Sequence, residues 1–350
     1  MDNFSRSQLV RKPAVASAGG IVAAQHRRAA ETGAAVLAGG GDAVDAAVAT
    51  SYAHGVVEPW MSGPGGGGAM VIHRAREGCC QVIDFGLKAP ADLDPAHYPL
   101  SGAGVSSDLF PWPAVVEDRN VMGGTSIAVP GTVDGMRVAH EAFGSKPWRE
   151  LVTPAAELAE EGLIVDWYAA LLIASATRAL ATNPCAAATF LEDGHWPTIS
   201  SWTALQQKRI DLSRMAATLR RIAERGPREL YEGETARGIV RDAQSAGGSL
   251  SEEDMRLYRA RLVESRAIPY RGGTIHATAE LTAGSTLAHA LAKLSAQPLA
   301  GGGRPDSAAY LAYAKALAEA YAWRLANMGD VEGGRTGPSC TSHFSVVDRH

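Results

Sequence analysis

The segment CTSHFSVVD, residues 340–348, carries more information about the fold and the chemistry than any other part of the sequence. Polar Ser345 stands between apolar Phe344 and Val346, an alternation that predicts a β-strand with one buried face. A Gly-rich, polar stretch precedes the segment at 328–339. The pattern therefore predicts a rigid strand with Thr341 at its beginning and a flexible approach before it.

Thr341 has the chemistry of a nucleophile that the chain itself could activate. A threonine hydroxyl is a weak nucleophile and needs a base. If the bond between Cys340 and Thr341 were cut, the new α-amine, with a pKa of roughly 7.7–8.0, could accept the hydroxyl proton near neutral pH. The same hydroxyl could make that cut by attacking the Cys340 carbonyl, followed by hydrolysis of the ester. Spacing alone equally fits an ordinary β-branched strand residue.

The sequence before this segment predicts an α+β fold. We expect a helix of small residues over 20–38, stopped by glycines 39–41, and a second helix capped by Asp42. Buried strands at 69–73 and 81–85 are expected to form a hairpin. Residues 95–125 are expected to form an irregular excursion, a long segment without regular helices or strands. A short strand should end near 127–131, and a strand pair is expected over 259–268 and 272–278. Helices are expected over 132–143, 153–161, 167–181, 204–225, 234–246, 285–294 and 306–326, with a capped start at Ser251.

Composition narrows the class of ligand. The chain has 350 residues, a net charge of -4 and 46% hydrophobic residues. This charge argues against nucleic acid as a partner and favours a small molecule. Four cysteines without metal-ligand spacing predict neither a disulfide scaffold nor a metal site. Because no signal-peptide core or membrane-length apolar run is evident, we expect a cytoplasmic protein that contacts no membrane.

Several motifs, in order along the chain, resemble the γ-glutamyltranspeptidase family. TSHFSVVD (341–348) is similar to the start of the family's small subunit. GGGDAVDAAV (39–48) resembles its E-G-G-N-A-V-D-A-A-V, and DFGLKAP (84–90) resembles its D-F-R-E-x-A-P. Further similar segments lie at 65–70, 129–133, 226–233, 247–248 and 319–322.

The resemblance implies an N-terminal-nucleophile hydrolase fold, an αββα four-layer sandwich that would be incomplete in this chain. It also implies self-cleavage before Thr341, with 1–340 as the large-subunit region and 341–350 as the start of a small catalytic subunit. Thr341 would then take a γ-glutamyl or related acyl group from a small amide and pass it to water or an amine, without a metal or organic cofactor. The small subunit would be the protein partner. We expect the chain to be part of a longer product and to be inactive alone.

One departure from the family bears on the substrate. The family's arginine in D-F-R-E-x-A-P, which holds the donor carboxylate, corresponds here to Gly86. Lys88 lies two residues on and would share a strand face with Gly86, so it could partly replace that charge, or it could be a solvated loop residue. An acylase without γ-glutamyl preference is therefore an alternative. A relative that binds or serves as a scaffold, without processing, is another.

Overall fold

The computed structural model describes residues 14–105, 113–198, 208–278, 282–299, 305–328 and 343–349. Within these ranges, helices combine with small antiparallel sheets, which confirms the predicted α+β class. Cys340 and Thr341, the residues of the predicted cleavage point, lie outside the described residues.

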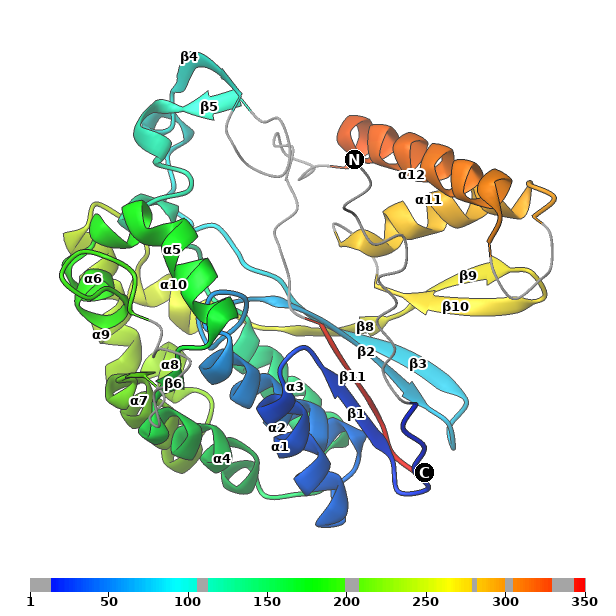
Figure 1. Ribbon diagram of the computed structural model, residues 1–350, viewed down its shortest axis with the longest axis horizontal. Helices are drawn as coiled ribbons and strands as arrows, with labels where there is room; N and C mark the ends of the chain where they lie inside the picture. Colours follow the sequence, from blue (N-terminus) through cyan, green and yellow to red (C-terminus); the bar gives the residue numbers. More distant parts are fainter. Residues whose placement is uncertain are drawn as a thin grey trace, which may run out of the picture.

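The two ends of the described chain meet in one sheet. Strand β1 (Ile21–Ala24) pairs antiparallel with β11 (Phe344–Val347), with Ile21 opposite Val347 and Ala24 opposite Phe344 (Figure 1). The predicted strand after Thr341 is thus confirmed for its described part. The prediction of one helix over 20–38 was wrong at its start, because only Arg27–Ala38 is helical (α1). The first residues form a strand because β11 supplies them with a partner.

A second sheet contains the predicted hairpin. Strands β2 (Gly68–Arg74) and β3 (Cys79–Phe85) pair antiparallel, and β8 (Arg261–Glu264) adds to the other edge of β3. The strand expected over 259–268 is therefore two strands, separated at Ser265. The second of them, β9 (Arg266–Tyr270), forms the expected pair with β10 (Gly273–Ala277).

Helix α2 (Ala43–Val57) is the central helix of the core. It begins at the predicted cap, where the Asp42 carboxylate accepts hydrogen bonds from the backbone N–H groups of Val44 and Asp45. Nearly every residue of α2 is buried. Small residues allow this close packing: a Cβ on Gly33 of α1 would lie 2.1 Å from the Thr50 hydroxyl oxygen of α2.

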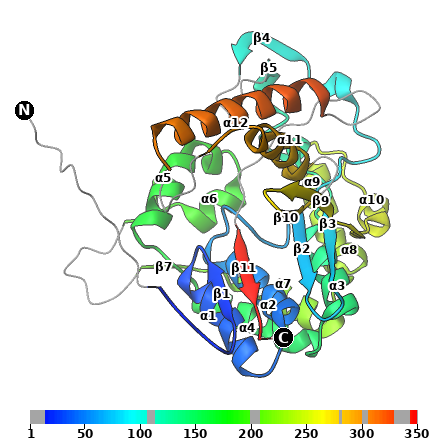
Figure 2. The same cartoon turned by 90° about the vertical axis from the view of Figure 1, so that its right-hand side faces the viewer.

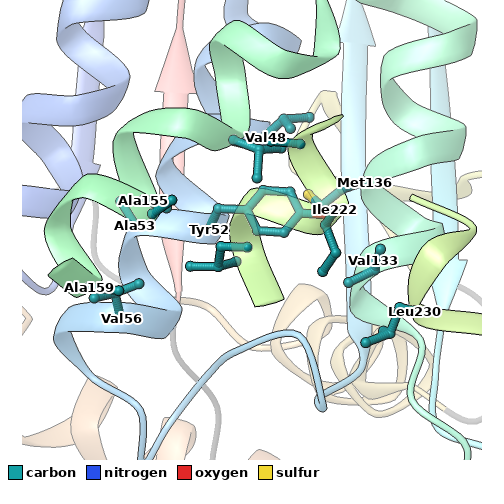
Figure 3. Packing of buried hydrophobic residues seen from close by; sticks show 14 of the residues in the cluster. Val48, Tyr52, Ala53, Val56, Val133, Met136, Ala155, Ala159, Ile222 and Leu230 are labelled. Atoms are coloured by element: carbon teal, nitrogen blue, oxygen red, sulfur yellow. The ribbon is translucent and has the colours of Figure 1, made fainter. Parts of the chain in front are cut away.

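The hydrophobic core fills the space between α2 and three other helices. Tyr52 of α2 packs with side chains from α3 (Thr132–Phe143), α4 (Trp148–Glu161) and α7 (Ser213–Arg225), as Figure 3 shows. The Tyr52 ring also meets Trp148 edge-on, with ring centroids 5.8 Å apart. Burial of this apolar surface supplies the main driving force for folding.

Most remaining elements confirm the helix predictions. Helix α4 begins earlier than expected, and 209–210 form a strand where a helix was predicted, so that α7 begins at Ser213. Two short helices and two short strands were missed, and only an isolated bridge from Val129 to Lys88 forms where a strand was expected near 127–131. The helices at their predicted places are α5 (Trp167–Ala181), α9 (Glu234–Ser245), α10 (Glu252–Leu257), α11 (Ala283–Ser295) and α12 (Ser307–Asn327). The missed elements are α6 (Pro184–Phe190), α8 (Glu229–Glu232), β6 (Leu163–Ile164) and β7 (Arg209–Ile210). The segment 95–125, expected to be irregular, contains the strands β4 (Leu100–Val105) and β5 (Pro113–Val115).

Helices α11 and α12 form an antiparallel pair beside the β9–β10 hairpin (Figures 1 and 2). Within the part of the chain that the structure describes, no helix is long and apolar enough to cross a bilayer.

Candidate active site

Strand β11 is fixed at both ends of its described length. Its pairing with β1 sets the register, and the Asp348 carboxylate accepts a hydrogen bond of 2.9 Å from the backbone N–H of Ala43, at the start of α2. The imidazole of His343 lies 3.1 Å from the Ser345 hydroxyl on the exposed face of the strand. A rigid strand therefore begins only a few residues after Thr341.

A cavity of about 770 Å³ lies beside β11. Its walls come from β11, from β2 on the other side, and from the first turns and the end of α2. The glycine loop before β2 also lines the cavity. The cavity places the described start of β11 next to a space that could accept a small molecule or further chain.

The glycine loop at 63–68 allows close packing of the backbone. The Gly66 carbonyl accepts hydrogen bonds from the N–H groups of Gly131 and Thr132, at 2.7 and 3.0 Å. A Cβ on Gly55 of α2 would lie 2.6 Å from the Gly63 Cα. Side chains would hold these backbones apart, so the loop needs glycine for reasons of packing.

Gly86 and Lys88 do not share a strand face. Strand β3 ends at Phe85, and Gly86 is exposed, with its carbonyl oxygen accepting a hydrogen bond of 2.7 Å from the Tyr258 hydroxyl. The backbone of Lys88 forms a bridge with Val129, and its ammonium lies 5.3 Å from the centre of the Tyr258 ring. Neither residue lines the cavity beside β11. Lys88 is thus exposed and held over an aromatic ring, a favourable cation–π position.

A second cation lies near Gly86. Arg261 on β8 stands directly opposite Asp84 on β3, and its guanidinium donates a hydrogen bond of 2.6 Å to the Asp84 carboxylate. The other oxygen of Asp84 accepts a hydrogen bond from the Gly86 N–H, at 3.2 Å. Sequence reasoning missed Arg261, because cross-strand pairing with β3 was not visible in the local pattern.

Asp134 on α3 anchors the elements around this loop. It is fully buried and accepts hydrogen bonds from the guanidinium groups of Arg137 and Arg228 and from the backbone N–H of Ala260. Burial alone would raise the pKa of Asp134, but the hydrogen bonds and the arginine charges outweigh it and hold the pKa below its usual value. The network joins α3 to the approaches of α8 and β8.

A polar group that the sequence did not single out lies under β11. His54 on α2 is fully buried, lines the cavity, and meets the Phe344 ring edge-on, with ring centroids 6.3 Å apart. Burial lowers the pKa of His54, and the nearby His26 lowers it further. Burial raises the pKa of Glu58, one turn along the helix, and the charge of Asp166 adds to this. The spacing of His54 and Glu58 was the only signal in the sequence.

Among the described residues, no group of three or more histidine, cysteine, aspartate or glutamate side chains is placed to hold a metal ion.

Comparison with known proteins identifies the fold and the family of this chain. A solved γ-glutamyltranspeptidase from Helicobacter pylori superposes with a TM-score of 0.79 at 29% identity, covering 91% of this chain and 87% of that one. The predicted N-terminal-nucleophile hydrolase fold is therefore confirmed. The family model for γ-glutamyltranspeptidase matches residues 29–344. The chain belongs to the γ-glutamyltranspeptidase family.

Two relatives in sequence carry different activities in their names. Glutathione hydrolase 3 of Arabidopsis thaliana is 30% identical over 275 residues, which cover 79% of this chain and 40% of the relative. The acylase ACY 1 proenzyme of Pseudomonas sp. (strain V22) is 35% identical over 262 residues, which cover 75% of this chain and 45% of the relative. The chain thus spans less than half the length of these relatives.

Proposed function

We propose that the protein containing this chain is an autoprocessing N-terminal-nucleophile hydrolase or transferase that acts on γ-glutamyl or related small amides. Cleavage between Cys340 and Thr341 frees the α-amine of Thr341, which then serves as base for its own hydroxyl. The hydroxyl attacks the amide carbonyl, and the amine of the substrate leaves with the transferred proton. Water or an acceptor amine then releases the acyl group and restores Thr341.

One observation carries this proposal. Strand β11 is held in register by β1 and tied to α2 through Asp348, so the chain just after Thr341 has a fixed place at the edge of a cavity. A nucleophile that must attack its own preceding carbonyl, and later a substrate, needs a rigid support on one side. The names of relatives that are proenzymes support the same processing step.

The γ-glutamyl preference is the main proposal, and the acylase alternative depends on Gly86. Glutathione hydrolases stand among the relatives, and so does the acylase. Gly86 supplies no charge for a donor carboxylate, while Lys88 and Arg261 lie in its neighbourhood. Water or an amine is the acceptor, and the segment released by cleavage is the protein partner. The cytoplasmic location stays a prediction.

The test compares the protein expressed from its complete reading frame with a Thr341→Ala variant. Denaturing electrophoresis should resolve two bands for the wild type and one for the variant, and N-terminal sequencing of the smaller band should begin Thr-Ser-His-Phe. A chromogenic γ-glutamyl amide and a matched acyl amide without an α-carboxylate then separate the two substrate classes. A single uncleaved band in the wild type would count against the proposal.

A further inference from the structure

The segment after α2 folds back over His54. Glu58 caps the helix, and its carbonyl accepts hydrogen bonds from the N–H groups of Met61 and Ser62, at 3.0 and 3.3 Å. This turn brings the Ser62 hydroxyl to 3.5 Å from Nδ1 of His54. On the other side of the ring, Nε2 lies 3.5 Å from a Glu58 carboxylate oxygen. The imidazole is thus placed between a hydroxyl and a carboxyl group.

The hydrogen-bonding capacity of this buried imidazole is poorly satisfied. Among the described residues, Nε2 of His54 has no hydrogen-bond partner of good geometry, although its side chain is fully buried. Buried polar atoms are nearly always paired, and the hydroxyl oxygens of Thr50 and Tyr52 on the same helix also lack a partner among the described residues. His54 lines the cavity and its ring contacts Phe344, so it lies next to the start of β11.

Phe344 is the link between His54 and the start of β11. It is the first residue of the strand, and it faces α2, whereas His343 and Ser345 are exposed. Its ring meets the His54 ring edge-on, and this contact holds the start of the strand against α2. The Glu58 carboxyl oxygen lies 3.5 Å from Nε2 but forms no hydrogen bond of good geometry with it, so an imidazolium would need water or a closer ion pair, and either would disturb the contact with Phe344.

We propose that His54 is a positioning residue, whose ring holds Phe344, the first residue of β11, against α2 and so fixes the start of the strand at the edge of the cavity. This role rests on the proposed function in so far as Thr341 precedes Phe344 in the sequence.

Burial sets the sign of the pH dependence of His54, and the neighbouring titratable groups add to it or oppose it. Because burial lowers the pKa of His54, an opened state with an ordinary pKa of about 6.5 gains protons first as the pH falls. His26, at the N-cap of α1, has a pKa lowered by burial and acts in the same direction. Glu58 has a raised pKa and acts in the opposite direction, and Asp166 at the cap of α5 faces both His26 and Glu58.

The first experiment needs no cleavage. In the Thr341→Ala protein, hydrogen–deuterium exchange of the peptide containing β11 is followed between pH 5.5 and 8, with the β2–β3 hairpin as the internal reference. Protection of β11 should fall about tenfold for each pH unit below 6.5 until the lowered pKa of His54 is reached. The variants His54→Leu and His54→Gln should remove this dependence, the second keeping polar groups at the site in case the first does not fold.

His26→Asn is the matched control. Asparagine preserves the cap that His26 provides to the Arg28 N–H, but it removes the second imidazole. The pH dependence should survive in this variant. The proposal is overturned if wild-type protection does not change with pH, if the dependence persists in both His54 variants, or if His26→Asn alone removes it.

The second experiment measures the cleavage rate before Thr341 in proteins that retain the threonine. The His54 variants should shift the acid limb of the rate profile, and His26→Asn should leave it in place. Should no protein be cleaved at all, the proposed function fails, while the exchange experiment still decides the role of His54. An unshifted acid limb in a cleaved protein would count against His54 alone.

Discussion

The hydroxyl of Tyr258 donates a hydrogen bond of 2.7 Å to the carbonyl oxygen of Gly86. The bond joins the chain between α10 and β8 to the loop that follows β3. It therefore fixes the backbone at Gly86, the position where the resemblance places the family's arginine. Tyr258 is itself buried and stacks on Tyr231, with ring centroids 5.7 Å apart.

The change Tyr258→Phe should weaken the fold modestly. It removes the donor to Gly86 and leaves the rings in place, so the free energy of unfolding should fall by about 0.5–1.5 kcal/mol. Urea denaturation followed by circular dichroism measures this. Tyr310→Phe on the exposed face of α12 is the control and should leave the midpoint unchanged. Equal effects of the two changes would mean that the bond to Gly86 contributes nothing.

The change Gly86→Arg should favour γ-glutamyl donors. A Cβ at this position would lie 3.5 Å from the Asp84 carboxylate, an ordinary contact, so the backbone can accept the side chain. One charge-assisted hydrogen bond to a donor carboxylate contributes about 1.5 kcal/mol, so kcat/KM for a γ-glutamyl amide should rise about tenfold. The amide without an α-carboxylate should not gain. Gly86→Met controls for bulk, and a gain with that variant would show that charge is not the cause.

The change Asp134→Asn should be strongly destabilising. It removes the buried charge that the partly buried guanidinium groups of Arg137 and Arg228 share, and breaking a buried pair in this way typically costs about 3–5 kcal/mol of unfolding free energy. Glu141→Gln is the control, because Glu141 is an exposed partner of the same Arg137. A loss for Asp134→Asn no larger than for Glu141→Gln would contradict the role of the network.

The contribution of Asp134 should also depend on pH. Its folded-state pKa lies below the ordinary value of 3.8. Such a group stabilises the folded state above the unfolded pKa, and the contribution is lost as the pH falls through the folded pKa. The difference in unfolding free energy between wild type and Asp134→Asn should therefore be constant near neutral pH and shrink below about pH 4. A difference that grows with acidification would have the wrong sign.

The change Gly135→Ala should disrupt the contact between α3 and β3. A Cβ on Gly135 would lie 2.3 Å from the Phe85 ring, closer than real contacts allow. Overpacking of this kind costs about 1–3 kcal/mol, more than the gain in helix propensity of up to about 1 kcal/mol. Gly65→Ala is the control, since nothing lies within 4 Å of its added carbon. A thermal midpoint for Gly135→Ala as high as for Gly65→Ala would contradict the close approach.

Local signals in the sequence predicted the elements whose ends are marked by caps. The start of α2 at Asp42 and the capping box of α10 at Ser251 were both correct. The β2–β3 hairpin was also correct, because apolar runs flank a short polar turn. In each case the information lies within a few residues of the element.

Elements that depend on distant partners could not be predicted in this way. The residues of β1 read as the start of a helix, because their partner β11 is at the other end of the described chain. β8 was assigned to the wrong sheet for the same reason. The site shows the same division: Thr341 was singled out by its chemistry and its motif, whereas His54 and Asp134 matter only through the elements that fold around them.

The pairing of β1 with β11 also bears on the order of events during synthesis. A contact between segments so far apart in the sequence forms late, because the entropy of closing so long a loop must be offset by structure in between. On a ribosome, β1 emerges long before its partner and has to wait for it. The threonine before β11 therefore reaches its rigid support only after the helical core has assembled, so that the proposed self-cleavage reports on an assembled core.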